Sequence, residues 1–315
     1  MERITTLKLL QDHYMLLESF CTDCRLRGMS TESIRRYRSS LGIFADYFND
    51  HDLIEVDMQM LKGFLGYLKY ERGVRHKTVE NNFSALSAFY DYLVFEGITN
   101  KNIILPFRKR YLKMYKKGYD DPQRKLLTIE EMSKLVNSII DPRDKALAVL
   151  LAKTGVRRGE LLRIDTDDID WNDYSIMLKP TPKRSNRLVF FDDEGAVVLR
   201  RWLKIREKLN PRTRALFVSY ATLDRFSRNG AYNAVVKYAK RLGFHDSESP
   251  RLEDHFGPHC FRHWFTTWLL RNGMPREYVK ELRGDERKEA IDLYHHIDRE
   301  ELRRTYLACI PKLGI

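Results

Sequence analysis

The sequence TGVRRGEL, residues 154–161, lies at the junction of two segments whose apolar residues recur at helical spacing. These segments span residues 141–154 and 158–164. The junction carries two adjacent arginines and a glutamate. A guanidinium group offers a planar fork of donors that matches the oxygens of a phosphate. An arginine in a basic protein is most simply a surface charge, so this turn is considered together with the other motifs of its domain.

The residues around this turn form the second of two predicted domains, 127–315. The sequence TIEE at 128–131 is a capping box that starts its first helix. Short β-like segments at 174–179 and 187–191 flank a loop and predict a hairpin or a small antiparallel sheet. Helical spacing resumes over residues 194–209, 223–242, 259–272, 276–282, 289–294 and 298–309. This domain is predicted to be mainly α, with one small antiparallel β-sheet.

A first domain is predicted over residues 1–105, as a bundle of four or five helices. Helical spacing is found over residues 7–20, 30–48, 57–70 and 78–95. The last three segments begin at Ser30, Asp57 and Thr78, which are residue types that cap helix N-termini. Residues 106–126 are rich in Lys and Arg and are interrupted by proline and glycine, so they predict a basic linker between the domains.

The chain of 315 residues is basic throughout. Its 56 Lys and Arg against 44 Asp and Glu give a formal net charge of +12 and a sequence pI of about 9.4. Such a protein is a candidate for binding a polyanion, most often nucleic acid. No apolar run approaches the roughly 20 residues of a membrane helix, and the N-terminus lacks the apolar stretch of a secretory signal. We expect a cytoplasmic protein without a membrane partner.

Four cysteines are too few for a disulfide scaffold in a chain of this length. Cys21 and Cys24 form a CxxC pair, but no second pair follows that would complete four zinc ligands. They are expected to be ordinary positions of a helix, with a metal or redox role as the alternative. No metal and no organic cofactor is expected.

Four motifs of the second domain occur together in a characteristic order. They are TGVRRGEL at 154–161, PKRSNRLV at 182–189, HCFRH at 259–263, and LRGD at 282–285 with Tyr294 nine residues after Asp285. In order, spacing and element placement they resemble the motifs of the tyrosine recombinase (phage integrase) family. The resemblance covers the whole second domain, and the basic helical first domain is similar to the core-binding domain of that family.

The resemblance implies a reaction in which a tyrosine hydroxyl attacks a DNA phosphodiester and leaves a 3′-phosphotyrosine and a free 5′-hydroxyl. Arg157 and Arg262 match the arginines that hold the nonbridging oxygens. Lys183 matches the general acid that protonates the leaving oxygen, and His259 matches a group that assists proton transfer or binds the phosphate. Tyr294 matches the nucleophile. Such catalysis depends mainly on positioning and on stabilising charge on the phosphate.

Neighbouring residues compete for three of these roles. Arg158 follows the clamp arginine directly, although the motif spacing selects Arg157, and Glu160 then falls at an acidic position that orients an arginine or supports the turn. Lys179 and Arg184 are alternatives to Lys183, because the hairpin length varies in the family. Tyr306 is the fallback for the nucleophile. His263 is expected to pack against or orient Arg262.

One position departs from the family, which usually has His or Trp where this chain has Asp285. A carboxylate beside a phosphate should repel it unless it is protonated or turned toward a cation such as Arg283 or Arg287. The sequence RGD at 283–285 resembles a pattern of some archaeal or archaeal-virus integrases. We treat Asp285 as a variant site residue whose role is structural support, and its charge leaves open a slower cleavage step.

The resemblance implies a site-specific DNA recombinase that serves DNA integration and excision or the resolution of chromosome or plasmid dimers. Its partners would be double-stranded DNA and three further copies of the chain, forming a tetramer on two DNA sites, with accessory DNA-bending proteins as further candidates. Two alternatives stay open: a DNA-relaxing topoisomerase of the same chemistry, and a DNA-binding regulator that does not cleave. The last predicted helix, 298–309, docks either on a neighbouring protomer or on its own domain.

Overall fold

The computed structural model describes residues 2–49, 51–113, 125–180, 187–249, 251–285 and 297–315. The chain divides into two compact units, Met1–Asp120 and Asp121–Ile315. Within the described residues, no helix combines the length and the apolar character that crossing a bilayer requires. Most of the described residues are helical, as the sequence predicted.

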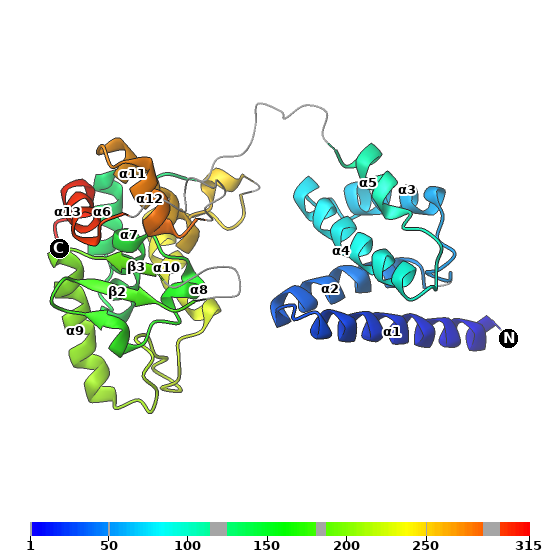
Figure 1. Cartoon of the computed structure of the whole chain (residues 1–315), viewed down its shortest axis with the longest axis horizontal. Helices are drawn as coiled ribbons and strands as arrows, with labels where there is room; N and C mark the ends of the chain where they lie inside the picture. Colours follow the sequence, from blue (N-terminus) through cyan, green and yellow to red (C-terminus); the bar gives the residue numbers. More distant parts are fainter. Residues whose placement is uncertain (1, 50, 114–124, 181–186, 250, 286–296) are drawn as a thin grey trace. The chain divides into compact units, whose positions relative to one another are not determined.

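The first unit is a helical bundle. Its elements are α1 (Glu2–Leu26), α2 (Thr31–Tyr47), α3 (Met58–Gly66), the π-helical turn η1 (Tyr67–Glu71), α4 (His76–Phe95) and α5 (Ile104–Tyr111) (Figure 1). Ser30 and Asp57 cap α2 and α3 through their side chains, as expected. The prediction that Thr78 starts the next helix was wrong, because α4 begins at His76 and follows Arg75.

Aromatic rings fill the core of this unit. The ring of Phe64 packs edge-on against that of Phe44 at 5.1 Å, and Phe20 packs edge-on against Phe89 at 5.6 Å. Cys21 and Cys24 are buried in the same core, and burial raises the pKa of the Cys24 thiol. No cluster of His, Cys, Asp and Glu suited to a metal occurs among the described residues. Both cysteines therefore act as small core residues.

Helix α5 occupies the first part of the segment 106–126 that was expected to be a linker. Ile104 and Phe107 are buried, and the ring of Phe107 stacks on that of Phe83 at 5.2 Å. Pro106 falls in the first turn of α5, where its missing N–H costs no intrahelical bond. The basic residues concealed this apolar face, so the first unit extends further than the predicted boundary at residue 105.

The second unit combines helices with a small sheet. Its helices are α6 (Ile129–Asn137), α7 (Pro142–Thr154), α8 (Arg158–Leu161), α9 (Asp193–Leu209), α10 (Arg228–Arg241), α11 (Pro258–Arg271), α12 (Arg276–Arg283) and α13 (Arg299–Cys309), with the short 3₁₀ turns η2 (Thr166–Asp168) and η3 (Leu252–Asp254). The strands β1 (Ile169–Asp170), β2 (Ser175–Leu178) and β3 (Arg187–Phe190) form an antiparallel sheet in that order, with Ile176 opposite Val189. The small predicted sheet is confirmed. The predicted helix over 223–242 starts only at Arg228, and the one over 289–294 lies outside the described residues.

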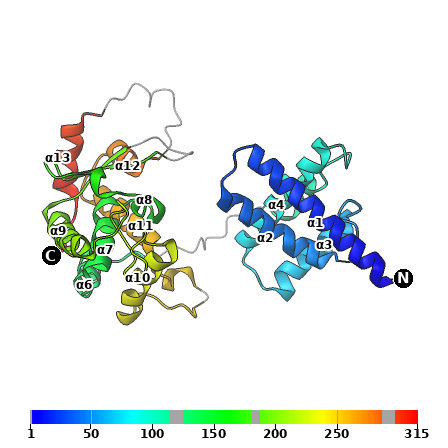
Figure 2. The same ribbon diagram turned by 90° about the horizontal axis from the view of Figure 1, so that it is seen from below.

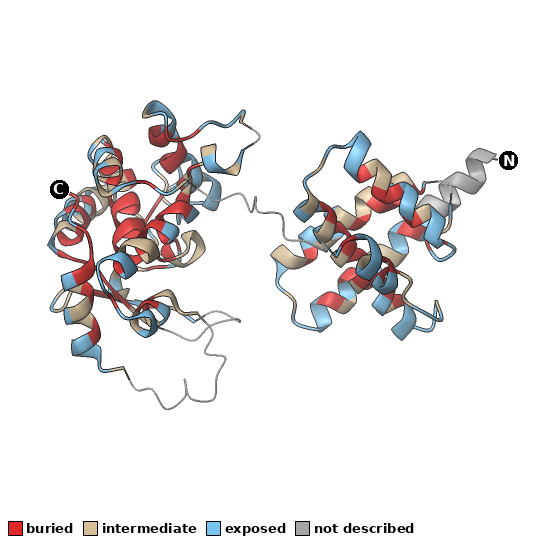
Figure 3. Cartoon of the chain, turned by 90° about the horizontal axis from the view of Figure 1, so that it is seen from above, coloured by how far each residue is buried: buried red, intermediate tan, exposed pale blue. Residues whose placement is uncertain are grey.

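Helix α7 is the centre of the second unit. It is buried on all sides, and α9 and α11 pack against it (Figure 2). A helix that is apolar on every face is stable only when other elements surround it. Most residues of α7 are buried. Figure 3 shows that buried residues lie in the interior of each unit. The turn at 154–161 follows this helix, so its start is held by the core of the unit.

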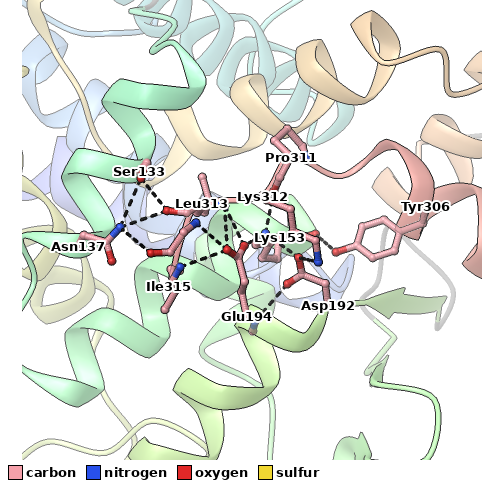
Figure 4. Close-up of polar contacts among 12 residues, drawn as sticks. Ser133, Asn137, Lys153, Asp192, Glu194, Tyr306, Pro311, Lys312, Leu313 and Ile315 are labelled. Carbon is pink, nitrogen blue, oxygen red and sulfur yellow. Dashed lines mark hydrogen bonds and ion pairs between the residues drawn. The ribbon is translucent and has the colours of Figure 1, made fainter.

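A buried lysine at the end of α7 holds the C-terminal tail. The ammonium of Lys153 is fully buried and donates to Asp192 Oδ2 at 2.8 Å, to Glu194 Oε2 at 2.6 Å and to the carbonyl of Pro311 at 2.7 Å (Figure 4). The carboxylate of Glu194 also accepts hydrogen bonds from three successive backbone N–H groups, at 313–315. The tail and α13 therefore dock on the second unit, to which they belong.

Replacing Lys153 by Met tests this cluster. The variant would leave the carboxylates of Asp192 and Glu194 buried without their shared cation, so we expect the free energy of unfolding to fall by about 3–5 kcal/mol in urea denaturation of the full chain. The exposed Lys204 of α9 is the matched control, and Lys204→Met should change the free energy by less than about 0.5 kcal/mol. Equal stability of the Lys153→Met and wild-type proteins would contradict this role.

Candidate active site

The site begins where α7 ends. Gly155 terminates α7 in the left-handed region, with φ of +59°. A Cβ atom at Gly155 would lie 2.2 Å from Cδ1 of Phe265 on α11, so only glycine permits this approach of the two helices. The approach places the carbonyl of Gly155 2.9 Å from Nη1 of Arg262.

Arg262 is the buried member of the predicted arginine pair. Only 5% of its side chain is exposed, and its Nη2 donates to the carbonyl of Arg283 at 2.9 Å. Burial, together with the neighbouring Arg157 and Arg283, lowers the pKa of Arg262 to about 9. The guanidinium therefore remains charged at neutral pH, and its cost of desolvation is offset by carbonyl and carboxylate acceptors.

Arg157 approaches the same point from the N-terminus of α8. Its backbone N–H donates to Glu160 Oε2 at 2.8 Å, and its Nη1 donates to the carbonyl of Arg283 at 3.4 Å. One main-chain carbonyl, that of Arg283, thus accepts from both Arg157 and Arg262. The structure brings together two arginines that lie far apart in the sequence, as a phosphate clamp requires.

A buried ion pair lies next to the clamp. Arg187, the first residue of β3, binds Glu160 through two hydrogen bonds of 3.0 and 2.9 Å. Burial alone would raise the pKa of Glu160, but hydrogen bonds from Arg187 and from the backbone of Arg157 outweigh it and lower the pKa to about 2. Glu160 therefore supports the turn, which is one of the two roles predicted for it, and pairs with Arg187 and, at 3.5 Å, with Arg157.

Arg187 has a role that the sequence motifs did not predict. Its Nε donates to the carbonyl of Leu282 at 3.1 Å, and a Cβ atom at Gly284 would lie 2.7 Å from its Cδ. Gly284 also ends α12 in the left-handed region. Arg187 therefore joins β3 to α8 and to the end of α12. Its position directly after the loop 180–186 could have suggested that Arg187 lies near the site. Its acceptor, the main-chain carbonyl of Leu282, could not be predicted, because every residue type has such a carbonyl.

Asp285 lies between the cations of the site. Its Oδ1 is 3.1 Å from Nη2 of Arg262 and 3.8 Å from Nη2 of Arg157, and its Oδ2 is 3.0 Å from Nε of Arg283. The carboxylate is thus turned toward cations, which is one of the two conditions under which we expected a carboxylate to be tolerated beside a phosphate. Arg287, the other cation suggested for it, lies outside the described residues.

The two histidines of the HCFRH motif lie on the exposed face of α11. The rings of His259 and His263 are edge to face, with centroids 4.9 Å apart. Arg262, three residues after His259 on the same helix, is buried, whereas both histidines are exposed. His263 is exposed, and its expected contact with Arg262 stays a prediction.

Of four other candidate residues, the structure describes only Lys179. Lys183, Arg184 and Tyr294 lie outside the described residues. The ammonium of Lys179 forms ion pairs with Asp165 and Asp168.

Two further side chains point away from the clamp. Arg158 lies over the ring of Tyr232 on α10, at 5.9 Å from its centroid. Tyr306 is fully buried and donates its hydroxyl to the carbonyl of Lys153 at 2.8 Å, and burial raises its pKa well above the usual value. Neither arrangement suits a reacting group.

Residues 125–301 match the phage integrase family, and residues 16–99 match the SAM-like N-terminal domain of phage integrases. The chain belongs to the phage integrase family. It is a tyrosine recombinase that cleaves and rejoins DNA.

Individual relatives agree with this assignment. The tyrosine recombinase XerC of Oceanobacillus iheyensis is 29% identical over 298 residues, covering 91% of this chain and 92% of that protein. The XerC of Psychromonas ingrahamii is 28% identical over 299 residues, with the same coverage of both chains, 91% and 92%.

Two solved structures share the fold. The XerH recombinase bound to its difH substrate has a TM-score of 0.64 at 21% identity and covers 91% of this chain and 82% of its own. A lambda integrase dimer bound to a COC′ core site has a TM-score of 0.66 at 17% identity and covers 90% of this chain and 97% of its own.

The pKa of Glu160 gives a test of the buried ion pair. Because folding lowers this pKa from 4.5 to about 2, the stabilisation is fully present above pH 4.5 and is lost as the pH falls through 2. We expect Glu160→Gln to cost about 3 kcal/mol in urea denaturation at pH 7, with the difference from wild type closing toward pH 2.

The exposed Glu253 supplies the control, since Glu253→Gln should show little difference from wild type at any pH. A Glu160→Gln deficit that stays constant from pH 7 to pH 3 would show that the carboxylate charge is not the source of the stabilisation.

Proposed function

We propose that this recombinase joins Tyr294 to a DNA strand through a 3′-phosphotyrosine and that Arg157 and Arg262 hold the reacting phosphate. The observation that carries the proposal is the convergence of the two guanidinium groups on Asp285 Oδ1, which is itself an anionic oxygen. An anion therefore already occupies the place between them. The spacing of Tyr294 from the end of α12 supports its role as the nucleophile.

The proposed reaction balances without a cofactor. The Tyr294 oxygen forms a bond to phosphorus, its proton passes to a base for which His259 is the candidate, and the bond to the 5′-oxygen breaks. Lys183 gives a proton to the leaving oxygen. A 5′-hydroxyl of another strand then attacks the phosphotyrosine and restores a phosphodiester, so the bond energy is conserved and no water takes part.

The arginines act on the charge that develops at phosphorus. A phosphodiester carries one negative charge, and attack by the tyrosine oxygen adds a second to the nonbridging oxygens. Fixed donors in a site shielded from water stabilise that added charge without reorganising. Arg262 meets this condition because its guanidinium is buried and held by the carbonyls of Gly155 and Arg283.

The contacts of the competing residues support the remaining roles. Lys179 is already bound to two carboxylates, those of Asp165 and Asp168, which favours Lys183 as the general acid. Tyr306 is buried against Lys153 and has a raised pKa, which favours Tyr294 as the nucleophile.

We further propose that four copies of the chain act in the cytoplasm on two duplex DNA sites, for integration and excision or for dimer resolution. The solved complexes of XerH with difH and of lambda integrase with a core site support binding to double-stranded DNA. The basic net charge of +12 supports contacts to the phosphate backbone.

Replacing Tyr294 by Phe removes the proposed nucleophile. Offered nicked suicide duplexes of randomised sequence, the wild-type protein should form a covalent adduct that migrates slowly on a denaturing gel and is sensitive to protease. Tyr294→Phe should form no adduct and still shift duplex DNA on a native gel. Tyr306→Phe should keep the adduct, and an adduct in Tyr294→Phe would refute the assignment.

Replacing either clamp arginine tests the phosphate contacts. We expect Arg157→Ala and Arg262→Ala each to slow formation of the adduct by about 10²–10³-fold at saturating protein, while DNA footprints persist. Arg158→Ala is the control, because that side chain lies against Tyr232 and should change the rate by less than about tenfold. Near-normal rates in both clamp variants would show that the clamp lies elsewhere.

A further inference from the structure

The carboxylate of Asp285 lies where the proposed function needs a phosphate oxygen. We propose that Asp285 competes with the reacting phosphate for Arg157 and Arg262, so that DNA must displace this carboxylate before the clamp closes on the phosphodiester. The inference rests on the proposed clamp and assigns to Asp285 an action that opposes substrate binding, in addition to structural support.

The first argument is geometric. Asp285 Oδ1 faces both clamp arginines, at 3.1 Å from Nη2 of Arg262 and at 3.8 Å from Nη2 of Arg157. A nonbridging phosphate oxygen bound between the two groups would need the same donors. Two anionic oxygens cannot share that position, because they repel each other and compete for the same N–H groups.

The clamp arginines, Arg157 and Arg262, do not need Asp285 for their orientation. Nη1 of Arg262 binds the carbonyl of Gly155, and its Nη2 binds the carbonyl of Arg283. Arg157 is held by Glu160 and by the same carbonyl of Arg283. With these contacts in place, loss of the Asp285 carboxylate leaves the clamp oriented and its anion-binding side open.

Asp285 lowers the net positive charge of the site. Among the described residues, Glu160 and Arg187 neutralise each other, which leaves the three cations Arg157, Arg262 and Arg283 around Asp285. With Asp285 in place the excess is two positive charges, and without it the excess is three. A phosphate that gains a second negative charge on attack is stabilised better by the larger excess.

The position of Asp285 allows the displacement. About a third of its side chain is exposed, so rotation about its first side-chain torsion moves the carboxylate toward water. Its backbone N–H is held by the carbonyl of Lys280 at 3.2 Å, and Gly284 fixes the preceding turn. The main chain can therefore stay in place while the carboxylate gives way to the phosphate.

Binding of inorganic phosphate to the full chain tests the proposal without knowledge of the DNA target. We expect Asp285→Asn to lower the apparent Kd for phosphate about tenfold, as for a competitor that fills the site about nine-tenths of the time, measured by the phosphate-dependent rise of Tm. Glu277→Gln, an exposed position at the other end of α12, removes the same charge and should leave the Kd unchanged. Asp285→Ser provides a second variant if the amide disturbs the turn.

Combining the substitutions with Arg157→Ala separates the two proposals. The gain from Asp285→Asn should disappear when Arg157 is also replaced by Ala. If Arg157→Ala weakens phosphate binding but neither Asp285 variant strengthens it, the competition by Asp285 is overturned and the clamp stands. If Arg157→Ala has no effect on phosphate binding in either background, the clamp itself is overturned, and Asp285 has nothing to compete for.

Discussion

The buried ion pair between Glu160 and Arg187 connects the segments that form the active site. Glu160 holds the backbone N–H of Arg157 at the start of α8, and Arg187 holds the carbonyl of Leu282 near the end of α12. Removing one partner of such a pair would leave a buried charge uncompensated, so the pair fixes the three segments relative to one another. The clamp arginines then need only short contacts to main-chain carbonyls to reach their final positions.

Sequence patterns predicted the mainly helical fold, the small antiparallel sheet and two of the three proposed helix caps in the first unit, because periodicity and capping are local properties. They missed α5, whose apolar positions Ile104 and Phe107 are hidden among basic residues. They selected Arg157 and Arg262 by motif spacing, and the structure brings both to one carbonyl, that of Arg283. They gave Arg187 no role, because no local pattern indicates that this arginine is buried or that it binds the carbonyl of Leu282, 95 residues further along the chain.

Lys153 connects the C-terminal tail to the turn at 154–161. The ammonium of Lys153 binds the tail through Pro311, while its carbonyl accepts the hydroxyl of Tyr306 from α13. The next residues, Thr154 and Gly155, begin the turn that carries Arg157. The sequence left open whether the last helix docks on a neighbour or on its own domain, and in the single chain it packs on its own domain, where Tyr306 is buried and donates to the carbonyl of Lys153.

The contact between Gly155 and Phe265 has a consequence for how this site can vary. Arg262 lies on α11 and Arg157 follows the last residue of α7 by three positions, and the approach of α7 to α11 is set by an aromatic ring lying directly on a glycine. Protein interiors transmit such a constraint because they are densely packed. A change of ring size at position 265 would thus alter the spacing of the two cations and tune the enzyme from inside its hydrophobic core.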